Sequence, residues 1–110
     1  MSDDPAFARL PAPPYYAVIF TTRRREGDDG YEAMAEKMAA LAATMPGYLG
    51  AESARGADRV GITVSYWESE AAIGNWRDNA EHTLARALGR TRWYEHFELK
   101  VAKVERAYGM

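Results

Sequence analysis

The apolar positions of this chain fall into blocks that are separated by short polar or glycine-containing turns. Residues 15–24 (YYAVIFTTRR) are rich in aromatic and β-branched side chains, are apolar on both faces and contain no Gly or Pro, so they predict a strand covered on both sides. In residues 31–44 (YEAMAEKMAALAAT), Met34, Met38 and Leu41 recur at helical spacing. The MPG sequence that follows ends this predicted helix.

The second half of the chain predicts two more strands, a helix and a last strand. A weaker strand starts at Tyr48, and VGITVSYW, from Val60, is a stronger one. The alternation in this stronger strand predicts two faces, one with Val60, Ile62, Val64 and Tyr66, and the other with Thr63, Ser65 and Trp67. Ser69 is a suitable N-cap for a helix that runs from about Glu70 toward Gly89.

The last predicted strand changes the parity of its apolar residues along its length. Phe97, Leu99 and Val101 share one parity, whereas Ala102 and Val104 share the other. A shift of one residue is what a β-bulge produces, so the pattern predicts a bulge after Val101. The strand would bend at this point or leave its own sheet for the sheet of a partner.

The order of elements is β-α-β-β-α-β, which is typical of ferredoxin-like α+β folds. We expect a four-stranded antiparallel sheet with two helices on one face, formed by residues 15–110. Residues 1–14, which are acidic and punctuated by proline, form a flexible N-terminal arm in this interpretation. Since the first and third strands carry few charges on either face, the uncovered face of the sheet is expected to pack on a second copy, giving a homodimer.

Composition excludes several classes of function. A net charge of −2 gives no strong attraction to nucleic acid or anionic membranes, and no apolar run approaches the roughly 20 residues of a membrane-spanning helix. The absence of cysteine excludes disulfides and a cysteine nucleophile and fits a cytoplasmic location. Because no phosphate-binding glycine motif, dinucleotide fingerprint or metal-spaced histidine cluster is present, we expect neither a cofactor nor a metal.

Three segments carry a resemblance to a known family: MPGYLG before the second strand, YWESEAAIGNW between the third strand and the second helix, and WYEHFELKVAKVERAYG at the end. With the order of elements, they make the chain similar to the antibiotic biosynthesis monooxygenase (ABM) superfamily over about residues 15–108. The resemblance implies a dimeric α+β barrel. It also implies several alternative activities, which include cofactor-independent oxidation of anthrone-type aromatic molecules to quinones and degradation of haem.

The haem-degrading branch uses an Asn on the first strand, a Trp on the second helix and a His ten residues after that Trp. Trp76 fits the second position, but Arg86 stands ten residues later, and the histidine lies earlier, at His82. The first strand offers Thr21 and Thr22 where the Asn is required. This set of three residues is therefore not carried over, and haem binding with His82 as the ligand is kept as an alternative.

The leading hypothesis is a cofactor-independent monooxygenase that oxidises a small hydrophobic, aromatic or enolisable molecule with dioxygen. Trp76 would shape the cavity, Asn79 would polarise an oxygen atom and His82 would remove a phenolic or enolic proton. The alternatives are core packing for Trp76 and simple solvation for the two polar residues. A helical wheel places His82 nearly opposite Ile73, so this imidazole reaches the pocket only if the helix breaks after Trp76.

Other residues complete the candidate site. Trp67 and Tyr66 are candidate substrate-binding residues, although packing is the alternative for Trp67. Residues 23–25 are three arginines that could bind an anionic group or form a solvated turn, and His96 is expected to be structural or at the surface. A further hypothesis is a non-catalytic dimeric protein that binds a small apolar molecule or acts in a stress response, with ligand binding but no oxygen consumption.

Overall fold

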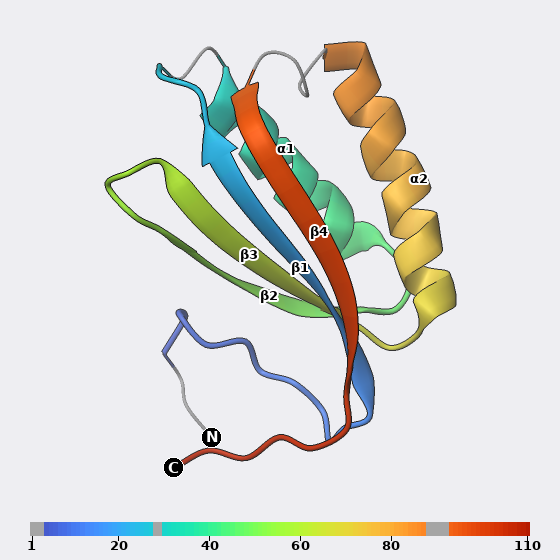
Figure 1. The fold of residues 1–110 in the computed structure, drawn as a ribbon. Helices are drawn as coiled ribbons and strands as arrows, with labels where there is room; N and C mark the ends of the chain where they lie inside the picture. The colour runs from blue at the N-terminus through green and yellow to red at the C-terminus, as the bar shows by residue number, and fades with distance from the viewer. Residues whose placement is uncertain (1–3, 28–29, 88–92) are drawn as a thin grey trace.

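The computed structural model describes residues 4–27, 30–87 and 93–110, with the backbone alone over residues 81–87. Its elements are β1 (Tyr15–Arg24), α1 (Tyr31–Thr44), β2 (Tyr48–Arg55), β3 (Val60–Trp67), α2 (Glu70–Ala87) and β4 (Tyr94–Val104). The strands form one antiparallel sheet in the order β2-β3-β1-β4, and both helices lie on the same side of it (Figure 1). The predicted ferredoxin-like α+β fold is confirmed.

The register between β1 and β3 defines the face that the helices cover. Tyr16 lies opposite Trp67, and residues directly opposite each other in an antiparallel pair point to the same side. Val18, two residues further along β1, packs with Ala42 of α1 and Ile73 of α2 in the core. The side of the sheet that carries these side chains is called the helix-covered face below.

The other side of the sheet, called the open face, carries the alternate residues. Ala17 lies opposite Tyr66 and Ile19 lies opposite Val64, so these side chains point away from the helices. Ile62 is in phase with them and is 45% exposed. The two faces of β3 are therefore those that its alternation predicts.

Small residues bring the two helices and the sheet together. The N–H of Ala72, in the first turn of α2, donates to the Ser69 hydroxyl at 3.1 Å, so the predicted N-cap of this helix is confirmed. Gly47, which follows α1, has a positive φ of 85° and lies directly against Ala72. A Cβ atom on Gly47 would lie 2.6 Å from the Cβ of Ala72. The approach of the α1–β2 turn to α2 therefore requires glycine.

The bulge predicted after Val101 in β4 is wrong. The register of β4 against β1 runs without interruption from Val104, opposite Tyr15, to His96, opposite Arg23. The irregularity in this pair lies beyond Arg23, at the beginning of β4. The strand therefore stays in its own sheet with one phase through the region where the apolar residues change parity.

The change of parity has a different physical origin, because β4 is an edge strand whose apolar side chains change face along its length. Leu99 and Val101 lie on the helix-covered face, opposite Phe20 and Val18. The apolar residues after them, Ala102 among them, lie on the open face. An unbroken strand can show this pattern when each of its faces is only partly covered.

The arm before β1 is described from residue 4, and part of it lies against β2. The N–H of Ala8 donates to Glu52 Oε2 at 3.0 Å, and a Cβ on Gly50 would lie 3.2 Å from the Cβ of Ala8. Glu52 therefore links the arm to the open face, and the flexibility of residues 1–14 stays a prediction. In the described part of the chain, no helix has the length and apolarity that crossing a bilayer requires.

Candidate functional site

Two tryptophans meet on the helix-covered face, where the end of β3 approaches α2. Trp67 is fully buried, and its ring stacks on that of Trp76 with 5.9 Å between centroids and 21° between planes. Trp67 Nε1 donates to the Ser65 hydroxyl at 2.9 Å, which satisfies its only donor. Tyr48 packs edge-on against Trp67, with 5.4 Å between ring centroids. We call Trp67 and Trp76 the tryptophan stack.

An apolar strip on β4 extends along the same face. It consists of Phe97, Leu99 and Val101, which lie opposite Thr22, Phe20 and Val18 of β1. Although these β4 residues are on the helix-covered face, Leu99 is 51% exposed and Val101 is 47% exposed. The helices therefore leave this edge uncovered, consistent with the position of α2 apart from β4 in Figure 1. This strip offers an apolar surface to a small molecule beside α2.

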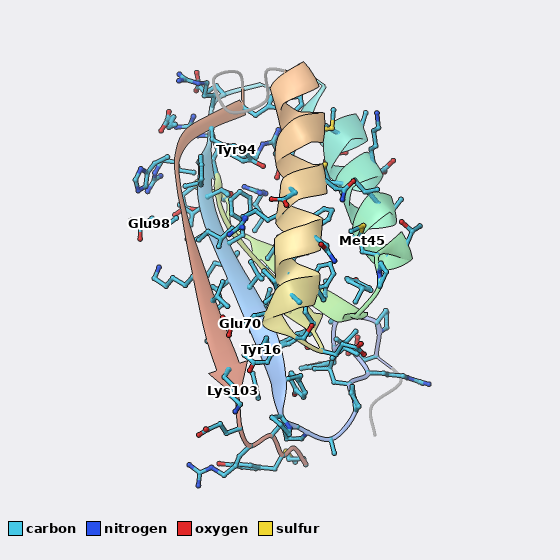
Figure 2. The ribbon with its side chains drawn as sticks, turned by 90° about the vertical axis from the view of Figure 1, so that its right-hand side faces the viewer. Tyr16, Met45, Glu70, Tyr94, Glu98 and Lys103 are labelled. Carbon is cyan, nitrogen blue, oxygen red and sulfur yellow. The ribbon has the colours of Figure 1, made fainter. Side chains whose placement is uncertain are left out.

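A second aromatic cluster lies at the far end of the strip, where β4 begins. The Phe20 ring is 5.8 Å from that of Tyr94 and 5.6 Å from that of Phe97, measured between centroids. Tyr31, the first residue of α1, packs edge-on against both Tyr94 and Trp93 at 5.8 and 6.1 Å. Figure 2 shows Tyr94 near one end of the space between β4 and α2, and Tyr16 near the other.

The phenol of Tyr94 is held in its neutral form. Burial raises the pKa of Tyr94, and its hydrogen bond to Tyr31 raises it further, whereas the charges of Arg55 and Arg24 oppose this shift. Arg55 Nη2 donates to the Tyr31 hydroxyl at 3.0 Å. The Arg24 guanidinium carbon lies 3.7 Å above the centre of the Tyr31 ring. This end of the strip therefore presents hydroxyl groups and two cations, rather than a base.

The candidate residues from the sequence do not all meet at this surface. Trp76 and Trp67 are brought together, next to the helix-covered face. Asn79 is exposed on α2, and its Nδ2 donates to the backbone oxygen of Asn75 at 2.9 Å. Tyr66 lies on the open face and donates to Glu52 Oε1 at 2.6 Å. Within one chain, Tyr66 and Trp67 are therefore on opposite sides of the sheet.

The break that would bring His82 toward the sheet is not found in α2. The helix continues from Glu70 to Ala87 in one piece. The side chain of His82 itself lies outside the described part of the structure, so its role as a base stays a prediction.

The other histidine contributes to a shallow hollow on the open face. His96 Nε2 lies 3.0 Å from Glu98 Oε2, and hydrogen bonds from His96 and Lys100 lower the pKa of the exposed Glu98 carboxyl. The hollow has a volume of about 240 Å³, which is below the roughly 300–1,000 Å³ of ligand pockets. A second hollow, of about 420 Å³, is lined by Ala54, Arg55, Gly56, Asp58, Val60 and Ile62. We place the candidate site on the helix-covered face because the tryptophan stack and the apolar strip lie there. Within residues 4–27, 30–87 and 93–110, no three potential ligands gather as a metal ion requires.

Arg55 and Tyr94 were not identified as residues of the candidate site in the sequence analysis. Their common position could have been found from the predicted topology, because β1 and β2 run parallel to each other in this sheet and β4 runs against them. The last residues of β1 and β2 and the first residues of β4 therefore lie at the same end of the sheet. Arg24, Arg55 and Tyr94 occupy these three positions.

Comparison with known proteins agrees with this architecture. The chain matches the family model described as antibiotic biosynthesis monooxygenase over residues 14–88. It is 54% identical over 99 residues to the uncharacterized protein YqjZ of Bacillus subtilis, covering 90% of this chain and 87% of that protein. It is 29% identical over 92 residues to the jasmonate monooxygenase ABM of Pyricularia oryzae, covering 81% of this chain but only 43% of that protein.

Among solved structures, a mutant of SnoaB, a cofactor-independent oxygenase from Streptomyces nogalater, superposes with a TM-score of 0.71. The alignment covers 86% of this chain and 97% of SnoaB at 15% sequence identity, so it bears on the fold alone. The match to the family model extends over more than half of the sequence. This chain therefore belongs to the antibiotic biosynthesis monooxygenase family.

Proposed function

We propose that this protein is a cofactor-independent monooxygenase that oxidises a small hydrophobic, aromatic or enolisable molecule with dioxygen. The observation that carries this proposal is the uncovered apolar strip, Phe97, Leu99 and Val101, on the face that also holds the tryptophan stack. A flat apolar ring can lie on such a strip and lose its water there. Family membership supports the oxygenase chemistry, as do the names of two relatives.

The proposed reaction uses the substrate as its own source of electrons. A phenol or enol loses a proton, and the electron-rich carbanion or enolate reacts with dioxygen. For an anthrone, the ring CH₂ loses both hydrogens and gains one oxygen atom as a carbonyl, while the second oxygen atom leaves as water. One anthrone and one dioxygen thus give one quinone and one water.

The protein residues have separate roles in this proposal. Trp76 forms the wall of the site beside the strip, since its ring is only partly buried and is fixed by the stack on Trp67. Asn79 polarises an oxygen atom after its Nδ2 leaves the Asn75 carbonyl. His82 as the base rests on the sequence alone, and the unbroken helix α2 does not supply the break that this role requires.

Oxygen uptake with an anthrone tests the proposal. Purified protein without added metal or cofactor is expected to consume dioxygen and to form the quinone in equal amounts, faster than the buffer does. Leu99→Asn places an amide on the strip and is expected to lower kcat/KM at least about tenfold. Lys100→Asn is the matched control, because Lys100 is the next residue on β4 and lies on the open face.

One outcome decides against the monooxygenase, and another decides against the strip as its site. Oxygen uptake no faster than in buffer, with the anthrone bound, would favour a non-catalytic binding protein. Equal kcat/KM values for Leu99→Asn, Lys100→Asn and the unchanged protein would show that the substrate does not bind on the strip.

We also propose that the protein acts as a cytoplasmic homodimer whose open faces pack against each other. The open face carries the apolar residues Ile19, Val60, Ile62 and Val64 on the two central strands, β1 and β3. Ile62 is 45% exposed in the single chain, and covering such a surface is favourable. The absence of cysteine is compatible with a reducing compartment.

A further inference from the structure

Arg55 is held flat against the helix-covered face at the end of β2. It lies opposite Gly61 of β3, and a Cβ on Gly61 would come within 2.6 Å of the guanidinium carbon. Arg55 Nη1 donates to the backbone oxygen of Arg59 at 3.1 Å, and Nη2 donates to the Tyr31 hydroxyl at 3.0 Å. The missing side chain of Gly61 and two hydrogen bonds thus fix this cation in one position.

Arg24 brings a second guanidinium to the same place from the end of β1. It stacks on the ring of Tyr31, with 3.7 Å from the guanidinium carbon to the ring centre. Its Nε is buried and has no hydrogen-bond partner among the described residues, and its Nη2 makes a long contact of 3.4 Å with the backbone oxygen of Gly27. A buried N–H without a partner is costly, so this group calls for an explanation.

The charges of these two arginines are not neutralised by a neighbouring acid in the described part of the chain. The ion pairs found there join other residues, such as Arg59 with Glu95 at 3.5 Å. Arg24 and Arg55 both act on the Tyr94 phenol through their charge. Tyr94 in turn packs on Phe20 and Phe97, where the apolar strip ends. An apolar surface thus leads to a pair of cations.

We propose that Arg24 and Arg55 bind the carboxylate of the substrate, whose apolar ring lies on the strip. A guanidinium presents parallel N–H groups that match the two oxygens of a carboxylate. Arg24 and Arg55 both lie against the ring of Tyr31, with 3.7 and 5.5 Å from the guanidinium carbons to the ring centre. The Tyr31 and Tyr94 hydroxyls lie beside the bound group. This inference rests on the proposed function, since it names the chemical class of the substrate as a small hydrophobic acid.

A pair of matched probes, 2-naphthoate and 2-naphthamide, tests this inference. They share one ring system and differ in charge, and their binding is followed by quenching of tryptophan fluorescence near Trp76. The unchanged protein is expected to bind 2-naphthoate at least about tenfold more tightly than 2-naphthamide, since hydrogen bonds to charged groups are the stronger class.

Substitution assigns the difference to the two arginines. Arg24→Gln and Arg55→Gln are each expected to weaken 2-naphthoate binding about tenfold and to leave 2-naphthamide binding unchanged, which also shows that the variants are folded. Gly61→Ala is expected to act like Arg55→Gln, because the new methyl group displaces the guanidinium. Arg23→Gln is the control, because Arg23 is on the same strand with its side chain on the open face.

Three results would overturn the carboxylate site: no binding of 2-naphthoate, equal affinity for the two probes, or an equal effect of Arg23→Gln and Arg24→Gln. None of these readouts depends on turnover. If selective binding of 2-naphthoate is found but no substrate consumes dioxygen, the monooxygenase proposal fails while the carboxylate site stands.

Discussion

The indole rings of Trp67 and Trp76 stack with 5.9 Å between their centroids and 21° between their planes. Trp67, at the end of β3, is fully buried, whereas Trp76, on α2, is only partly buried. The pair therefore connects the core of the sheet with α2, which lies beside the apolar strip of β4. Trp67 mainly stabilises the fold, and Trp76 is the ring that we propose to contact a ligand.

This difference predicts unequal losses of stability. Trp67→Ala is expected to lower the free energy of unfolding by about 3–5 kcal/mol, because it leaves a cavity in the core. Trp76→Ala is expected to cost about 1–2 kcal/mol, since it removes the ring pair and a partly buried surface. Urea unfolding followed by circular dichroism measures both. Tyr108→Ala, at a 98% exposed position, is the control, and equal losses at Trp67 and Trp76 would contradict the assignment.

Substitution by alanine is expected to change the stability of the protein in opposite directions at two glycines, one packed against α2 and one within it. Gly47 has a φ of 85°, and its Cβ would lie 2.6 Å from Ala72, so Gly47→Ala should destabilise the protein by about 1–3 kcal/mol. Gly74 is inside α2 with open space around its Cβ position, so Gly74→Ala should stabilise it by about 0.5–1 kcal/mol. Thermal unfolding of the two variants decides this. A rise in Tm for Gly47→Ala would mean that the turn does not approach α2 as described.

Tyr66 predicts a loss of stability at alkaline pH. Burial raises the pKa of its phenol, and the hydrogen bond to Glu52 raises it further. The folded state therefore retains this proton at a pH where the unfolded chain has lost it. The stabilising contribution is complete below the ordinary tyrosine pKa of about 10 and disappears as the pH rises through the folded-state value.

Tyr66→Phe is accordingly expected to make the free energy of unfolding fall less steeply above about pH 10. It should also remove one late-ionising group from a titration of tyrosinate absorbance, while the late ionisation of Tyr94 remains. Tyr108→Phe is the control, at an exposed position. An unchanged pH dependence in Tyr66→Phe would show that this phenol ionises normally.

The fold could be predicted because its signals are local. The alternation of β3 places Trp67 and Val64 on opposite faces, and the Ser69 cap marks the beginning of α2, as found. The prediction for β4 failed after Val101 because the parity of apolar residues reports which side is covered, and an edge strand can be covered on different sides along its length. Register, which distinguishes this from a bulge, depends on the partner strand.

The candidate site was less predictable for the same reason. Trp76 could be identified from its own segment, but the position of Arg55 depends on Gly61 across the strand pair and on Tyr31 from another element. The sequence shows an exposed strand end at Arg55. Only the register shows that its guanidinium is held over the sheet, next to Arg24.

The exposed side chain of Ile62 allows a test of the proposed homodimer. Ile62 lies on the open face between Thr21 of β1 and Ala54 of β2. If two open faces pack together, Ile62→Lys buries a charge without a partner and brings it close to its symmetry copy, which costs several kcal/mol. In the single chain the same change is expected to cost little, because the side chain is 45% exposed.

Sedimentation velocity compares the variants at one concentration. The molar mass from sedimentation is expected to be twice the chain mass of 12.3 kDa for the unchanged protein. For Ile62→Lys it is expected to equal the mass of one chain. Thr63→Lys is the matched control, since Thr63 is the next residue on β3, is exposed and points to the helix-covered face, so this variant should remain a dimer. A monomeric unchanged protein, or a dimer that survives Ile62→Lys, would exclude the open face as the interface. Far-ultraviolet circular dichroism of both variants separates dissociation from unfolding.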